Sequence, residues 1–405
     1  MLVSRPLSLY RRSPSSLSMP VAATEGPFSG LFVVKDEEAE AEDSYCWGIC
    51  RRRRIKKPPF PQDRILTIIH SSSQYEEAKS TKVWLLPVLD RPLSSNRYYL
   101  IKARGKHKGK AYKCSREDEI TTCCFGDVLS DKKPSAFNLK DIYQQFQIHR
   151  YHGGGFYAQS VAPDGVPPKF LRTKGWKLRS SSSSTLHLPF EEALGLDSSS
   201  RQLLPDFNFP IFTTRSPPVV VGIWFCPFVF VRENSISIRT QMKISPIYSL
   251  TLEQCWEEMV SCENPNDETS SIVTVAIDVS REVVLVAGRE VEREKGDEHR
   301  KGFVWFKVSN RLDSSGKALG VGLSIALVEK MRWVQEAGGW FGGCSDNGEE
   351  KVVRVEKVEE ITSENGWRRF SLYMLVESFV LRRSNGGLVW KYNFRHTHTI
   401  KCKWE

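Results

Sequence analysis

The run WKYNFRHTHTIKCKWE, from Trp390 to Glu405, carries the clearest structural signal in this chain. Its even-numbered positions hold aromatic, histidine, isoleucine and cysteine residues, and its odd-numbered positions are all charged or polar. Side chains of a β-strand alternate between two faces, so this pattern predicts one long strand with its even face buried. The preceding Ser-Asn-Gly-Gly at 384–387 is typical of a hairpin turn.

Residues 219–383 contain further strand-like segments and two predicted helices. The expected strands are Val219–Val231, Ile272–Ile277, Val283–Val286, Phe303–Val308, Lys351–Val358 and Phe370–Leu381. Thr251 and Gln254 form a capping-box pattern, which predicts a helix start. A longer helix is expected over residues 319–337, because apolar residues recur on one face and Gly338 follows it. Those residues are Leu323, Leu327, Met331 and Val334.

The first half of the chain is also rich in strand-like segments. The expected strands are Leu31–Lys35, Arg64–His70, Lys82–Leu89 and Arg97–Lys102. A short helix is expected after Asn138. Residues 151–218 are loop-rich, and the tract Ser180–Ser184 and the pair Pro217–Pro218 are the best linker candidates.

These segments predict an α+β fold that is mainly β. Two β-rich halves are joined by a loop-rich middle segment, and the helices are few and short. The expected divisions are a basic β-rich region at 1–150, a linker region with short helices at 151–218, and a β-rich region with one long helix at 219–405.

Composition narrows the class of protein. The chain has 405 residues, of which 40% are hydrophobic and 26% charged, as in ordinary globular proteins. The longest apolar run, Val219–Val231, is shorter than the ~20 residues that a membrane helix needs. Ten scattered cysteines do not form a disulfide framework, and no apolar signal-peptide core precedes them. We therefore expect an intracellular protein, cytoplasmic or nuclear, without a transmembrane span.

The N-terminus admits a second interpretation. Its first 24 residues contain three Arg and six Ser but no Asp or Glu, which is the composition of an organellar transit peptide. The alternative is that this segment is simply the first strand or arm of the fold.

The chain resembles the plant family catalogued only as domain of unknown function 1262. The similar stretches begin at Arg5, Glu25, Pro92, Gly105, Asp141, Val161, Pro168, Ala193, Pro205, Thr251 and Phe394. Because the resemblance begins at Arg5, it favours a folded N-terminal segment over a transit peptide. It implies no reaction, ligand or catalytic residue.

Positive charge is concentrated in the N-terminal half. Residues 1–218 hold 33 Lys and Arg against 22 Asp and Glu, whereas residues 219–405 hold 25 against 26. An anionic partner would therefore dock on the first half. The candidate anion-binding residues are Lys102, Arg104, Lys106, Lys108 and Lys110, with Arg51, Arg52, Arg53 and Arg54.

Each basic segment has an alternative interpretation. The run Arg51–Lys57 could be a nuclear-import signal or an anion patch, or a solvated loop neutralised by the acidic run Asp36–Asp43. Residues 102–110 would place alternate cations on one side of a hairpin, with Tyr98, Tyr99 and Tyr112 close enough to stack on bases. A charged edge that prevents aggregation is the alternative.

Catalytic and metal sites receive little support. The sequence His-Gly-Gly-Gly at 152–155 resembles the oxyanion loop of esterases, but the nearest nucleophile, Ser324, falls within the predicted helix. Asp346 and His396 would complete such a triad, and a pocket that joined His149 or His152 to Asp164 would also favour an enzyme.

Metal ligands are equally weak. His396, His398 and Cys402 share one strand face, and the pair Cys46 and Cys50 could combine with Cys123–Cys124. The histidine face also carries Trp390, Tyr392, Phe394 and Ile400, which favours a core edge, and neither cysteine pair has the spacing of a zinc site. We therefore predict no metal and no cofactor.

The function that the sequence favours is a non-enzymatic binding or scaffold protein with a protein partner. Binding of nucleic acid or another polyanion through the basic half is the first alternative, and an enzyme with an unrecognised site is the second.

Overall fold

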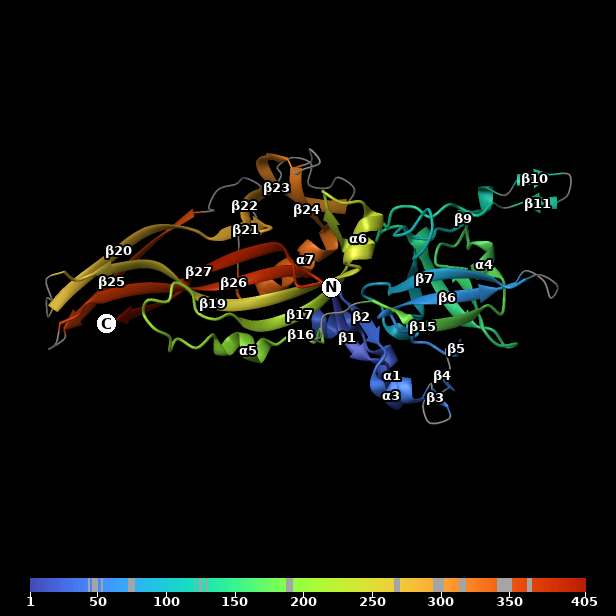
Figure 1. The fold of residues 1–405 in the computed structure, drawn as a ribbon, viewed down its shortest axis with the longest axis horizontal. Coiled ribbons are helices and arrows are strands. Elements are labelled where there is room, and N and C mark those ends of the chain that lie inside the picture. Colours follow the sequence, from blue (N-terminus) through green and yellow to red (C-terminus); the bar gives the residue numbers. More distant parts are fainter. Residues whose placement is uncertain are drawn as a thin grey trace.

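The computed structural model describes the chain except for residues 43, 46–49, 52–53, 72–76, 120, 124–125, 129, 187–191, 266–269, 294–301, 313–317, 341–351 and 363–365. The described part is elongated (Figure 1). A seven-stranded sheet forms one end, and long strands of a larger sheet run toward the other end, where the C-terminus lies. The N-terminus lies near the middle, where the two sheets meet.

The seven-stranded sheet is antiparallel, in the order β13-β12-β8-β7-β6-β15-β5. Its strands are β5 (Arg54–Ile55), β6 (Arg64–His70), β7 (Lys79–Pro87), β8 (Arg97–Lys102), β12 (Gln145–Arg150), β13 (Phe156–Ser160) and β15 (Lys177–Thr185). A bridge between Phe156 and Trp176 brings β13 close to the start of β15. The sheet therefore curls around its own core, in which Phe60, Tyr98 and Trp176 are fully buried.

The second sheet has twelve strands, in the order β18-β24-β23-β22-β21-β27-β26-β19-β17-β1-β2, with β16 paired to β17. Its strands are β1 (Leu2–Pro6), β2 (Gly30–Val34), β16 (Gly195–Leu196), β17 (Val219–Pro227), β18 (Val231–Glu233), β19 (Ile247–Glu263), β21 (Glu282–Val286), β22 (Arg289–Arg293), β23 (Phe303–Leu312), β24 (Ala318–Ser324), β26 (Arg369–Arg383) and β27 (Leu388–Trp404). The two N-terminal strands, β1 and β2, thus extend a sheet that the C-terminal residues build.

Short ribbons and helices complete the fold. The two-stranded ribbons pair β20 (Ser270–Ser280) with β25 (Val352–Thr362), β9 (Ser115–Arg116) with β14 (Gly165–Val166), β10 (Thr121–Cys123) with β11 (Gly126–Val128) and β3 (Ser44–Tyr45) with β4 (Cys50–Arg51). The α-helices are α1 (Leu7–Arg12), α2 (Val21–Glu25), α3 (Glu37–Glu42), α4 (Lys169–Arg172), α5 (Ser198–Leu203), α6 (Ile238–Ile244) and α7 (Ile325–Ala337). The 3₁₀ turns are η1 (Pro14–Ser18), η2 (Leu93–Ser95), η3 (Glu117–Glu119), η4 (Ile142–Gln144) and η5 (Phe228–Phe230).

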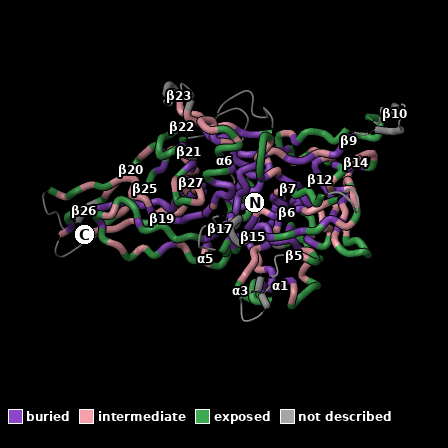
Figure 2. The backbone as a smooth tube through the Cα atoms, turned by 45° about the vertical axis from the view of Figure 1, so that its right-hand side comes forward, coloured by how far each residue is buried: buried purple, intermediate pink, exposed green. Residues whose placement is uncertain are grey.

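One large core joins the two sheets. Trp84 and Tyr99, from the outer face of the seven-stranded sheet, belong to the same buried cluster as Phe228 and Phe230 of the second half. The rings of Trp84 and Phe228 stack at 6.0 Å. Buried residues continue through this junction in Figure 2, so the two sheets share one core.

The mainly β, α+β class is confirmed, and so is the long C-terminal strand. Its alternation is interrupted, however, because Leu375 pairs with His396 whereas Met374 pairs with Ile400. The bulge at 397–399 leaves His398 exposed and Thr397 buried, against the predicted order. The three-part division of the chain at residues 150 and 218 stays a prediction.

Three local predictions are wrong. The capping-box segment at 251–254 lies inside strand β19, because Leu250 and Leu252 are buried on one sheet face. The predicted helix at 319–337 is strand β24 followed by α7, which begins after Ser324. The serine tract is no linker: residues 180–184 belong to β15, which pairs with β6.

Candidate functional site

The predicted basic segment at 102–110 forms a compact loop after β8. The Lys102 amide donates to the Lys110 carbonyl at 2.8 Å, and the Gly109 amide donates to the Lys102 carbonyl at 2.8 Å. Gly105 and Gly109 have φ angles of +82° and +86°, which other residues rarely adopt. Because residues 104–109 form turns rather than strands, the predicted alternation of cations on a hairpin is wrong.

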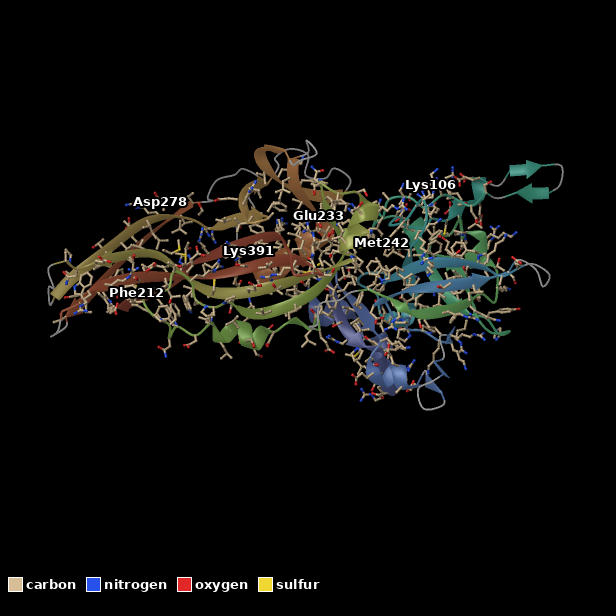
Figure 3. All side chains as sticks on the ribbon, viewed as in Figure 1. Lys106, Phe212, Glu233, Met242, Asp278 and Lys391 are labelled. Carbon is tan, nitrogen blue, oxygen red and sulfur yellow. The ribbon has the colours of Figure 1, made fainter. Side chains whose placement is uncertain are left out.

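Helix α6 brings further cations to this loop from the other half of the chain. A Cβ atom on Gly109 would lie 3.3 Å from the Ile238 carbonyl oxygen, so the loop packs directly on the helix. Desolvation, followed by repulsion from Arg239 and Lys243, lowers the pKa of Lys108. In Figure 3, Lys106 lies at the edge of the molecule and Met242 marks α6.

A second set of cations surrounds His107. The pKa of His107 is lowered mainly by desolvation and then by repulsion from four lysines, Lys110, Lys102, Lys106 and Lys133. We define the loop patch by its cationic side chains, which are Lys102, Arg104, Lys106, Lys108, Lys110, Lys133, Arg239 and Lys243. Within the described part of the chain, no ion pair involves any of these eight residues. The positive charge of the patch is therefore not neutralised by an acidic side chain of the described residues.

The second predicted basic segment is only partly described. Arg52 and Arg53 lie outside the described residues, and Arg51 is described only by its backbone, which pairs with Ser44. Arg54 is exposed on β5, directly opposite Arg179 of β15. Like charges in opposite positions destabilise a sheet, so an anion near this pair would relieve repulsion.

The acidic run expected to neutralise Arg51–Lys57 has other partners. In α3, Glu38 and Glu42 pair with Arg12 and Arg11. Glu40 pairs with Arg64 at 3.4 Å. Of these three contacts, none involves the basic run, so the predicted neutralisation across the loop is not observed for Arg54.

The tyrosines expected to stack on bases are unavailable for that role. Tyr98 and Tyr99 are 1% exposed and Tyr112 is 6% exposed. Burial raises the pKa of Tyr112 to about 12, and the Tyr99 hydroxyl donates to the Leu139 carbonyl at 2.9 Å. The loop patch thus offers charge to a ligand without these rings, and the stacking prediction is wrong.

Sequence reasoning missed Lys133, Arg179, Arg239 and Lys243. Arg239 and Lys243 are spaced four residues apart on a helix, which places them on one face. That spacing was the available signal, but it lies in a half of the chain with almost no net charge. Only the packing of α6 against the loop makes it part of a patch.

The predicted catalytic combinations are not assembled. Ser324 is at a strand-to-helix junction, contrary to expectation, but its Oγ atom accepts the Leu327 amide as an N-cap and its backbone is extended and unstrained. Asp346 lies outside the described residues. Asp164 accepts hydrogen bonds from the Tyr143 hydroxyl, while His149 stacks on Tyr157 and His152 is exposed.

No cluster of three or more potential metal ligands occurs among the described residues. The bulge in β27 separates His396 from Cys402, and His398 faces solvent. Cys46 and Cys124 lie outside the described part. In that part of the chain, no helix combines the length and apolar character needed to cross a membrane.

A buried polar cluster joins β26 of the twelve-stranded sheet to α5. Arg201 of α5 donates to both oxygens of Glu377 at 2.7 and 2.6 Å, and Gln254 donates to Glu377 Oε1 at 3.0 Å. His396 Nε2 lies 3.3 Å from Glu377 Oε2. Burial alone would raise the pKa of Glu377, but the neighbouring His396 and Arg201 lower it to about 2. Since Glu377 is 1% exposed, we interpret this cluster as structural.

Comparisons with known proteins agree with the sequence resemblance. Residues 25–125 match the family described as Protein of unknown function (DUF1262). No curated protein matches the chain. The crystal structure of Cry35Ab1 is similar with 13% sequence identity and a TM-score of 0.43, over 85% of this chain and 90% of that one.

Proposed function

We propose that this chain, whose residues 25–125 carry the sequence of the family of unknown function DUF1262, is a non-enzymatic binding protein that holds a polyanionic partner on the loop patch. The observation that carries the proposal is the meeting of two cationic elements. Gly109 of the loop packs on Ile238 of α6, and desolvation, followed by repulsion from Arg239 and Lys243 of that helix, lowers the pKa of Lys108. Bringing these like charges together does not stabilise the fold, whereas it does favour the binding of an anion.

The chemistry of the patch restricts the partner. Lysine and arginine side chains contact phosphates or carboxylates by charge, and the nearby tyrosines are buried. We therefore propose that the partner is recognised through its anionic backbone or surface rather than through stacked bases. Both an acidic protein surface and a nucleic-acid backbone fit this description, and the choice between them stays a prediction. The intracellular location also stays a prediction.

The test is the salt dependence of binding to a fluorescent 20-bp DNA duplex and to heparin. Duplex affinity falls with salt with a slope of about −0.9 per phosphate contact. We expect the double variants Lys106→Glu/Lys108→Glu and Arg239→Glu/Lys243→Glu each to reduce that slope by about 2 and to weaken binding. The matched control is Arg289→Glu/Arg368→Glu, which reverses two exposed cations that lie outside the patch.

Three outcomes separate the interpretations. Equal losses in the control variant would reduce the effect to net charge and contradict the patch. Absence of binding to both polyanions at 50 mM salt would also contradict it. If the complex isolated from cells survives nuclease but dissociates with salt, the partner is an acidic protein that uses the same surface.

A further inference from the structure

A shallow groove of ≈ 270 Å³ lies on the twelve-stranded sheet, distant in sequence from the loop of the patch. Its apolar wall consists of Val220, Ile223 and Phe225 of β17. Ile223 alternates away from its neighbour Trp224, which packs in the main core, whereas Phe225 also belongs to that core. The volume is just below the range of about 300–1,000 Å³ that is usual for sites that bind small molecules.

The polar side of the groove is set by strand register. Thr251 lies opposite Ile223, and Ser249 lies opposite both Phe225 and Arg382. Glu253 follows on the same face of β19. The hydroxyl and carboxylate groups of β19 therefore lie one strand away from the apolar wall, and the Arg382 guanidinium of β26 lies two strands away. An amphipathic ligand requires such a pairing of polar and apolar surfaces.

Val220 is an unusual residue for an open sheet face. It is 44% exposed, and its neighbour Val219 is 40% exposed. The strand register shifts between Val220 and Gly222, which leaves this end of β17 less tightly paired. A ligand body that covers Val220 would remove this apolar surface from water, which favours binding.

Arg382 has hydrogen-bonding capacity left over. Its Nη1 atom donates to Glu253 Oε1 at 2.8 Å and to Thr251 Oγ1 at 3.2 Å. Within the described structure, the Nε and Nη2 atoms have no protein acceptor. Those two atoms form the fork that binds a carboxylate with two parallel hydrogen bonds. The side chain is 36% exposed, so the fork is accessible.

The surrounding charges favour an anion despite Glu253. Lys391 follows on the adjacent strand β27 (Figure 3) and its pKa is lowered by burial and then by Arg215, while Cys255, Glu253 and Glu257 oppose that shift. Glu257 is shared by Arg395 at 2.9 Å and Arg215 at 4.0 Å. Four cations therefore face two carboxylates along this strip.

We propose that the groove binds a small monocarboxylate with an apolar body. The carboxylate lies on the Nε and Nη2 fork of Arg382, and the body packs against Val220 and Ile223. If an amide replaces the carboxylate, the ligand loses the charge-assisted hydrogen bonds. If an amine replaces it, the ligand is repelled by Arg382, Lys391, Arg215 and Arg395. This site is independent of the loop patch, since the two share no residue.

The experiment uses phenylacetate as the probe, with phenylacetamide and benzylamine as its neutral and cationic counterparts. Binding to the full chain is measured by calorimetry and by saturation-transfer NMR. We expect phenylacetate to bind, phenylacetamide to bind at least tenfold more weakly, and benzylamine not to bind. Equal binding of the amide or the amine overturns the proposal, as does absence of phenylacetate binding.

Two variants test the assigned residues. Arg382→Gln removes the fork, and Val220→Asp places a like charge on the exposed wall, at the position opposite Glu253. Each is expected to weaken phenylacetate binding at least tenfold, whereas the exposed control Arg289→Gln retains it. Unchanged binding in either groove variant overturns the assignment, so the test holds even if the other variant folds poorly.

The loop-patch variant Lys106→Glu/Lys108→Glu separates this inference from the proposed function. It should lose polyanion binding and keep phenylacetate binding, while Val220→Asp should show the reverse. Loss of phenylacetate binding in the loop-patch variant would assign the effect to overall charge and overturn the groove.

Discussion

At the scale of single residues, Glu377 links stability to pH. Its folded pKa of about 2 lies below the ordinary value of 4.5, because His396 and Arg201 overcome the opposing effect of burial. The ionised form therefore stabilises the fold, fully above pH 4.5 and progressively less as the pH falls toward 2. We expect Glu377→Gln to cost about 3–5 kcal/mol at pH 7 by leaving Arg201 buried and unpaired.

Urea unfolding between pH 2.5 and 7 checks this expectation. The stability of Glu377→Gln should depend less on pH across the acid range than that of the unsubstituted protein. Glu290→Gln, at an exposed position of β22, serves as the control and should leave the acid range unchanged. Parallel pH profiles for the unsubstituted protein and Glu377→Gln would contradict the assignment.

Gly222 is a second residue whose identity the packing requires. A Cβ atom there would lie 2.5 Å from the ring of Trp224, which is completely buried. Since the ring has no space to move, Gly222→Ala should destabilise the protein by about 1–3 kcal/mol. Thermal unfolding measures this, with Gly387→Ala between β26 and β27 as the control, because a Cβ atom there would meet only side-chain atoms, the nearest being Asn385 Oδ1 at 3.1 Å. Equal melting temperatures for the two variants would show that the sheet yields locally.

At the scale of elements, the loop and α6 repel each other. Desolvation and the cations Arg239 and Lys243 lower the pKa of Lys108, so its charged form costs stability at neutral pH. We expect Lys108→Gln to raise stability by about 0.2–1 kcal/mol at low salt, as for exposed charge pairs. The gain should shrink at 0.5 M salt because of screening. A gain that is independent of salt would point to packing instead, and Lys140→Gln provides the exposed control.

At the scale of the molecule, a polyanion on the loop patch would contact both halves. The loop follows β8 of the seven-stranded sheet, while α6 follows β18 of the larger sheet. Ligand at 100 times its dissociation constant would stabilise the folded state by about 2.7 kcal/mol. We expect heparin to raise the melting temperature of the unsubstituted protein but not of Lys106→Glu/Lys108→Glu. Equal shifts in both proteins, measured by scanning calorimetry, would contradict this coupling.

A structural feature could be predicted from the sequence when neighbouring residues determine it, and could not when it depends on a distant segment. The alternation in β27 was predictable because each residue carries its own face preference, whereas the bulge at 397–399 depends on the partner strand β26. The serine tract has no apolar pattern, and its strand is formed by pairing with β6 and β5.

The same reason explains the candidate site. Lys102–Lys110 could be identified as a basic segment from composition alone. The contribution of Arg239 and Lys243 could not, because it arises from a contact between loop and helix that are more than 100 residues apart. The capping-box pattern at Thr251 predicted a helix start, but burial of the neighbouring leucines on the sheet favours a strand there.

The pairing of Leu2 with Phe225 has a consequence for biosynthesis. Residues 2 and 225 are separated by 223 positions, and ribosomes add about 5–20 residues per second, so the nascent β1 waits roughly 11–45 s for that partner. The seven-stranded sheet can form during that interval, since its strands all lie between residues 54 and 185. Translation order therefore favours a stage at which one half is folded while the opening segment still presents an unpaired edge to the chaperones of the cell.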